Sequence, residues 1–151
     1  MVSPLKTTVT DKPRIVLVFG VFDLLHPGHI AFLKIAKSYG DRLVVVVTRD
    51  KRAELEKGQR PVYKLTERML MLQALDCVDE ALPGDIDGQW NMVKNIAPHV
   101  ICIGHDQSKD HPKFLAQLKE LKQLPRIVQL PSFNRKRYST SRLRELMLDN
   151  R

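Results

Sequence analysis

The chain has 151 residues, of which 43% are hydrophobic and 28% are charged. This length suits one compact domain and the composition is that of a folded globular protein, which excludes a multidomain enzyme and a largely disordered chain. The net charge of +8 favours an anionic partner such as phosphate, nucleic acid or an acidic membrane. No apolar run is long enough to span a bilayer and the first twelve residues form no signal-like apolar block, so we expect a cytoplasmic protein.

Short apolar runs rich in β-branched residues predict the buried strands of a parallel sheet. Residues 1–13 precede them as an N-terminal tail, and residues 14–151 are predicted to form the domain. The four clear strands are 15–19, 43–47, 100–103 and 127–130, with a weaker strand at 78–82.

Amphipathic or capped segments predict helices between and after these strands, at 28–39, 66–75, 89–96, 112–121 and 139–148. Gly40 is expected to close the first helix, and Thr66 to cap the second. The charged stretch 48–61 is predicted to be a basic loop.

Alternation of strands and helices predicts the fold class, α/β. We expect a Rossmann-like, open, parallel five-stranded sheet with helices on both faces. Ligands of such sheets bind beyond the carboxyl ends of the strands. The functional residues should therefore lie in the segments that directly follow strands, 20–29, 48–59, 104–109 and 131–141.

The segment after the first strand reads GVFDLLHPGH over residues 20–29. His26 and His29 lie three positions apart at a predicted helix N-terminus, where free N–H groups and the helix dipole favour an anion. Gly20 and Gly28 have no side chains, so a phosphate can approach the backbone. This combination is typical of a site that stabilises charge on a phosphoryl group.

The same segment resembles the HxGH signature of the cytidylyltransferase-like nucleotidylyltransferases, and the resemblance extends from about residue 14 to residue 147. It implies that His26 and His29 are catalytic. It also implies nucleotide contacts from Gly20, Val21, Phe22, Asp23 and Gly28.

A second segment is similar to the hydroxyl-rich ISTTxI-type turn with which this family holds the triphosphate. It implies nucleotide binding by Tyr138, Ser139, Thr140 and Ser141. The alternative is that Ser139 is an ordinary helix cap. Arg137, at the end of a basic run that begins at Arg135, is expected to bind phosphate or the acceptor and to draw in anionic substrates rather than nucleic acid.

The resemblance assigns further residues between the two signatures. Lys57 is expected to reach the phosphates as a third catalytic residue, and Arg68 to contact phosphate or the acceptor. Gly104 and Asp106 are expected to line the nucleotide pocket. The alternatives are a solvated charged loop for Lys57, an exposed helix arginine for Arg68 and a polar turn for Asp106.

The implied activity is nucleotidyl transfer from ATP or CTP to a phosphate monoester, with release of pyrophosphate and with Mg²⁺ carried by the nucleoside triphosphate. The first half of the chain looks most like archaeal-type FAD synthetases, which adenylylate FMN. Cytidylylation of glycerol-3-phosphate or a similar alcohol phosphate is the alternative enzyme, and a noncatalytic nucleotide-binding module is the alternative of another class. We expect no nucleic-acid or membrane partner, a possible homodimer as in relatives, and two reduced thiols at Cys77 and Cys102.

Overall fold

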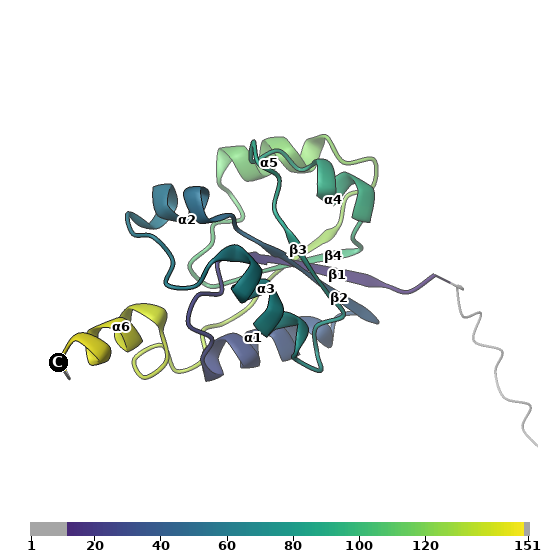
Figure 1. Cartoon of the computed structure of the whole chain (residues 1–151). Coiled ribbons are helices and arrows are strands. Elements are labelled where there is room, and N and C mark those ends of the chain that lie inside the picture. The colour runs from purple at the N-terminus through teal and green to yellow at the C-terminus, as the bar shows by residue number, and fades with distance from the viewer. Residues whose placement is uncertain (1–11, 150–151) are drawn as a thin grey trace, which may run out of the picture.

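The structure is a computed structural model that describes residues 12–149, so most of the predicted N-terminal tail lies outside the described residues (Figure 1). The strands are β1 (Ile15–Gly20), β2 (Arg42–Val47), β3 (Glu80–Pro83), β4 (Val100–Ile103) and β5 (Arg126–Gln129). The helices are α1 (Pro27–Lys37), α2 (Asp50–Lys57), α3 (Leu65–Gln73), α4 (Asn91–Ile96), α5 (Pro112–Lys119) and α6 (Thr140–Asp149).

The five strands form one parallel sheet in the order β3-β2-β1-β4-β5, which confirms the predicted α/β architecture. Val18 of β1 pairs with Val45 of β2 on one side and with Cys102 of β4 on the other. Chain order reverses between β1 and β4, and ligands of open parallel sheets bind at such a switch point. The β1–α1 segment begins there, where the two histidines were predicted.

Apolar side chains alternate along β1 and so build a core on each face of the sheet. Val16 and Val18 join the core formed with α1 and α3, while Leu17 belongs to the core formed with α4 and α5. In Figure 1, α4 and α5 lie above the sheet and α1 and α3 lie below it. Both α2 and α6 lie beyond the edge at which the strands end, next to the expected site (Figure 1).

The prediction of a loop throughout 48–61 is wrong, because residues Asp50–Lys57 form α2. This helix escapes an analysis of apolar periodicity, since it buries only Ala53. Its end carries a recognisable signal: Gly58 adopts a φ of 70°, the left-handed conformation that commonly closes helices.

Two predicted caps are also wrong. Residue 66 lies inside α3, which begins at Leu65; Lys64 precedes it and donates its N–H to Glu67 Oε2 over 2.8 Å. Helix α1 ends at Lys37, with Ser38 as its C-cap. Gly40 serves close packing instead, because a Cβ there would lie 2.6 Å from the carbonyl oxygen of Arg14.

Both cysteines are free thiols, as predicted. Cys102 is buried in β4, and this burial raises the pKa of its thiol to about 11. Burial also raises the pKa of Cys77. A reactive cysteine needs a stabilised thiolate, so neither environment favours nucleophilic chemistry. Among the helices that the structure describes, none has the length and apolar character required to cross a membrane.

Candidate active site

The loop between β1 and α1 has a strained backbone that fixes the position of the two histidines. Phe22 and Leu24 both have a φ of 50°, in a region that side chains rarely adopt. Gly20 makes room for the Phe22 side chain, because a Cβ on residue 20 would lie 2.5 Å from the Phe22 ring. Phe22 and Leu24 are each only 6% exposed, so the packing of their side chains maintains the strained conformation.

His26 caps α1 with its own ring. Its Nδ1 accepts the backbone N–H of Gly28 at 3.1 Å and that of His29 at 3.4 Å. A nitrogen that accepts these bonds carries no proton, so the proton of the neutral ring is on Nε2. Burial lowers the pKa of His26, which favours this neutral form. Gly28 permits the arrangement, since a Cβ there would lie 2.9 Å from His26 Nδ1.

His29 stacks on His26, with ring centroids 3.7 Å apart and planes inclined by 23°. Burial, together with the neighbouring His26, lowers the pKa of His29 to about 3, although Asp23 and Asp106 act in the opposite direction. Its Nδ1 is buried and has no hydrogen-bond partner among residues 12–149. The two histidines are therefore a neutral, closely packed pair. Their ring N–H groups can donate hydrogen bonds to a phosphate.

The depressed pKa of His29 predicts that the protein loses stability in mild acid. Below about pH 6.5 the unfolded chain binds a proton at this residue and the folded chain does not, so the free energy of unfolding falls as pH falls. We expect the melting temperature to drop between pH 7.5 and 5, and to drop less in a His29→Asn variant. The control is His111→Asn, a change at the exposed histidine that caps α5. A pH dependence in His29→Asn equal to that of the unmodified protein would contradict the prediction.

The second predicted segment lies at the start of α6. Ser139 Oγ accepts the N–H of Arg142 at 3.1 Å, so Ser139 does cap the helix. Thr140 Oγ1 donates to the carbonyl oxygen of Asp23 at 2.8 Å, which joins this turn directly to the histidine loop. The aromatic ring of Tyr138 stacks parallel to Phe133 and lies 5.3 Å from the Arg137 guanidinium carbon.

The segment before this turn approaches the start of α1. A Cβ on Gly28 would lie 3.5 Å from the carbonyl oxygen of Phe133. The two helix N-termini that were predicted to bind phosphate are thus brought together by the fold, although more than 100 residues separate them in sequence. Ser141 is exposed beside them at the second position of α6.

Asp23 is buried, with 4% of its surface exposed. Its carboxylate accepts the N–H groups of Val62 at 2.7 Å and Tyr63 at 3.0 Å, and it forms an ion pair with Arg144 at 2.8 Å. Three donors already satisfy this carboxylate. The geometry therefore favours a structural role for Asp23, in which it holds the loop in place, rather than the predicted contact with the nucleotide.

Arg68 is fully buried, contrary to the expectation that it contacts substrate. Its guanidinium donates to the carbonyl oxygens of Tyr63, Val21 and Thr48 and forms an ion pair with Asp50 at 2.6 Å. These bonds join the segments after β1 and β2 to α3. The geometry therefore assigns Arg68 to the support of the site, with no surface exposed to a phosphate.

Lys57 and Asp106 act on the pKa of His29 in opposite directions. Lys57 is the exposed last residue of α2, and its positive charge contributes to the lowered pKa of His29. Asp106, in the segment after β4, acts on His29 in the opposite direction. Its Oδ1 lies 3.0 Å from the position of a Cβ on Gly104, whose N–H donates to Gln107 Oε1. Both predicted residues thus lie within electrostatic range of His29.

Two further arginines of this region were missed by the sequence analysis. Arg144 reaches Asp23 from α6, and Arg49 donates from Nε to the carbonyl oxygen of Gly84 at 2.6 Å. Arg144 follows Thr140 by four positions and therefore shares its helix face, which is a signal that the sequence contained. Arg49 lies in the segment 48–59, where functional residues were expected, but no spacing distinguishes it from the other basic residues there.

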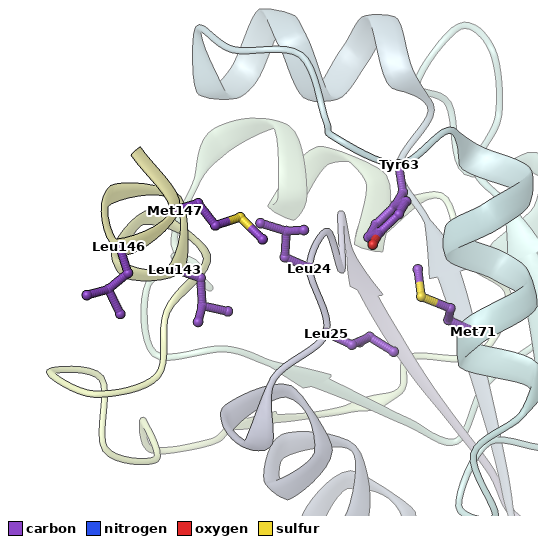
Figure 2. A pocket seen from close by; sticks show the side chains of 7 residues that line it. All are labelled: Leu24, Leu25, Tyr63, Met71, Leu143, Leu146 and Met147. Carbon is purple, nitrogen blue, oxygen red and sulfur yellow. The ribbon is translucent and has the colours of Figure 1, made fainter. Parts of the chain in front are cut away.

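Two pockets lie at the end of the sheet where the strands finish, and the smaller of them is lined in part by the histidine loop. One, of about 450 Å³, lies at the carboxyl ends of β2 and β3. It is lined by Arg49, Gly84, Asp85, Ile86, Asp87, Asn91 and Met92. The other, of about 380 Å³, lies between the loop, α3 and α6, where Met147 points toward Leu24 and Tyr63 points toward Met71 (Figure 2). It is lined by Leu24, Leu25, Tyr63, Met71, Leu143, Leu146 and Met147.

Comparison with known proteins shows the family to which the chain belongs. A family model described as cytidylyltransferase-like matches residues 17–146. A protein named FAD synthase from Thermococcus sibiricus is 41% identical over 82% of this chain and 84% of its own length. A second FAD synthase, from Pyrococcus horikoshii, is 35% identical over 90% of this chain and 93% of its own length.

Two solved structures share the fold. One, titled as a lipopolysaccharide core biosynthesis protein from Thermoplasma volcanium, has a TM-score of 0.74 and 33% identity, and the match covers 82% of this chain and all of that one. The other is a pantoate-beta-alanine ligase from Francisella tularensis, with a TM-score of 0.50 and 14% identity, covering 91% of this chain and 70% of that one.

Proposed function

The chain belongs to the cytidylyltransferase-like family, and from this premise we propose that it is an FMN adenylyltransferase, which forms FAD and pyrophosphate from FMN and ATP. The observation that carries the proposal is the similarity to proteins named FAD synthase, which extends over most of both chains at 35% and 41% identity. The paired histidines beside the α6 turn supply a site that suits nucleotidyl transfer. Location in the cytoplasm and assembly as a homodimer stay predictions.

In the proposed reaction an oxygen of the FMN phosphate forms a bond to the α-phosphorus of ATP. The bond from that phosphorus to its bridging oxygen breaks, and the bridging oxygen leaves with pyrophosphate. The attacking phosphate is already ionised near pH 7, so the protein need only align the reactants and stabilise charge. We assign that stabilisation to His26 and His29, and we assign the β- and γ-phosphates to Lys57 and the start of α6.

The pocket beside β2 and β3 has room for an acceptor of the size of FMN. Its volume of about 450 Å³ falls within the range of pockets that bind drug-sized ligands. Ile86 and Met92 offer apolar contacts for a ring system. The positive charge of Arg49 is opposed by Asp85 and Asp87 in the same lining, so the pocket does not select for a phosphate. The choice of FMN over the alternative acceptor therefore rests on the similarity to proteins named FAD synthase rather than on this pocket.

Mg²⁺ is proposed to enter with ATP as part of the substrate. Among residues 12–149 no group of three or more histidine, cysteine or acidic side chains is close enough together to hold a metal ion. The donors around the histidines are imidazoles, backbone N–H groups and hydroxyls, which suit phosphate oxygens better than a divalent cation. Mg²⁺ bound to ATP would neutralise charge that develops on the leaving pyrophosphate.

The proposal predicts FAD formation from ATP and FMN in the presence of Mg²⁺ and little product from other pairs. The test measures pyrophosphate release, with FAD identified by chromatography, for ATP or CTP paired with FMN, glycerol-3-phosphate, phosphocholine or phosphoethanolamine. Signal restricted to ATP and FMN is expected. Omission of Mg²⁺ or addition of a chelator should abolish it.

Other outcomes of the same grid would replace the proposal. Turnover of CTP with an alcohol phosphate would establish the cytidylyltransferase alternative. Binding of ATP without pyrophosphate release from any pair would favour the noncatalytic module.

A further inference from the structure

Helix α6 carries the proposed triphosphate turn but has little apolar attachment to the domain. None of its described residues, through Asp149, is buried, and Met147 and Leu148 are 60% and 64% exposed. Most helical stability in proteins comes from packing of an apolar face. The position of α6 relative to the histidines must therefore depend strongly on its polar contacts.

Two of those polar contacts converge on one residue of the histidine loop. Thr140, in the first turn of α6, donates to the Asp23 carbonyl oxygen, and Arg144, one turn later, pairs with the Asp23 carboxylate. The ion pair is well shielded, with side-chain exposure of 19% for Arg144 and 4% for Asp23. Removal of Arg144 would leave the Asp23 carboxylate buried without its counter-charge, which costs more than the loss of an exposed pair.

The same pair also holds the segment that leads into α3. Arg144 donates a second bond to the Arg60 carbonyl oxygen at 3.1 Å, and the Asp23 carboxylate accepts the N–H groups of Val62 and Tyr63. Three segments that are distant in sequence thus meet at one buried carboxylate: the histidine loop, residues 60–63 and α6.

We propose that Arg144 is a positioning residue that, through Asp23, locks the 139–141 turn of α6 opposite His26 and His29 so that ATP binds in the reactive geometry. This inference rests on the proposed function of the site as an ATP-dependent transferase. Arg144 itself does not need to touch ATP. Its effect is a coupling between the docking of α6 and nucleotide affinity, and such couplings commonly change affinity by about 5- to 150-fold.

The test compares Arg144→Met with Arg144→Lys and with a matched control, Arg142→Met. The control removes the same charge from the same helix, where the Arg142 side chain forms an exposed ion pair with Glu145. We expect Arg144→Met to raise the KM for ATP and the Kd for ATP without acceptor by about tenfold, while the KM for FMN changes by less than about threefold. Arg144→Lys should recover most of the ATP affinity, and Arg142→Met should match the unmodified protein.

Thermal unfolding of each variant separates positioning from a general loss of structure. If Arg144→Met lowers the melting temperature and reduces kcat through a smaller active fraction, with both KM values unchanged, the inference is overturned. Equal loss of ATP affinity in Arg142→Met would also overturn it. Titration with ATP alone keeps this test independent of the acceptor. A protein that binds ATP but makes no FAD would refute the proposed function, while the Kd for ATP of Arg144→Met would still confirm or overturn the role of Arg144.

Discussion

Replacement of His29 by alanine is expected to lower kcat for FAD formation by about 100- to 1000-fold, the usual cost of removing one donor to a developing anion. The His29 ring is held against His26 at 3.7 Å between centroids and is neutral in the free protein. Its buried Nδ1 has no hydrogen-bond partner among residues 12–149. The preorganised ring therefore contributes mainly in the transition state, and kcat should change more than the KM for ATP.

Steady-state kinetics with ATP and FMN measure this effect, and His111→Ala provides a matched control. Like His26, His111 caps a helix, with its Nδ1 accepting the N–H of Lys113 at 3.2 Å, but it does so on α5. The control should keep its full kcat. A His29→Ala protein that turned over at the normal rate would remove the histidines from the mechanism.

His26 requires a different variant, because alanine would remove both its ring and the cap of α1. His26→Asn keeps an oxygen that can accept the Gly28 N–H, since asparagine is a good N-cap residue. The comparison of His26→Asn with His26→Ala would separate the stability of α1 from the stabilisation of charge.

The parts of the molecule that could be predicted are those encoded by local pattern. The four clear β-branched runs were predicted within one residue at each end, and the weaker run at 78–82 begins two residues later as β3. The short spacing of His26 and His29 placed both on one helix start, and the structure stacks them there. Such features depend on neighbours along the chain, so the sequence is enough to find them.

Long-range polar contacts could not be predicted in the same way. Asp23 and Arg144 are 121 residues apart, and nothing in a single sequence states that a loop acid and a helix arginine will meet. Helix α2 was missed for a related reason: it buries only Ala53, so its residues show no apolar stripe. Contacts and helices of this kind depend on the folded environment more than on periodicity.

Arg68 lies between these two cases. It follows Leu65 by three positions and precedes Leu72 by four, so the helical spacing of α3 already places it on the face that packs against the sheet. An arginine on a core face must find acceptors, because a buried charge without partners is very costly. The spacing therefore contained the signal of burial, whereas the resemblance to a family directed attention to substrate.

Replacement of Arg68 by methionine is expected to destabilise the protein by about 3–5 kcal/mol, the usual cost of removing one partner from a buried ion pair. The change leaves Asp50 without its partner and removes the donor to the carbonyl oxygens of Val21, Thr48 and Tyr63. Methionine has nearly the length of the arginine stem, so the loss is mainly one of charge and hydrogen bonds rather than of volume. Denaturant titration at pH 7.5 measures the free energy of unfolding.

The control is Arg52→Met, which removes an arginine whose pair with Glu56 is about half exposed and which should cost less than about 1 kcal/mol. Arg68→Lys should fall between the two, because it keeps the charge but cannot reach several carbonyl oxygens at once. The alternative that Arg68 binds substrate predicts the opposite pattern. In that case Arg68→Met would fold with unchanged stability and would raise the KM for ATP or FMN, so one pair of measurements decides between support of the site and contact with the substrate.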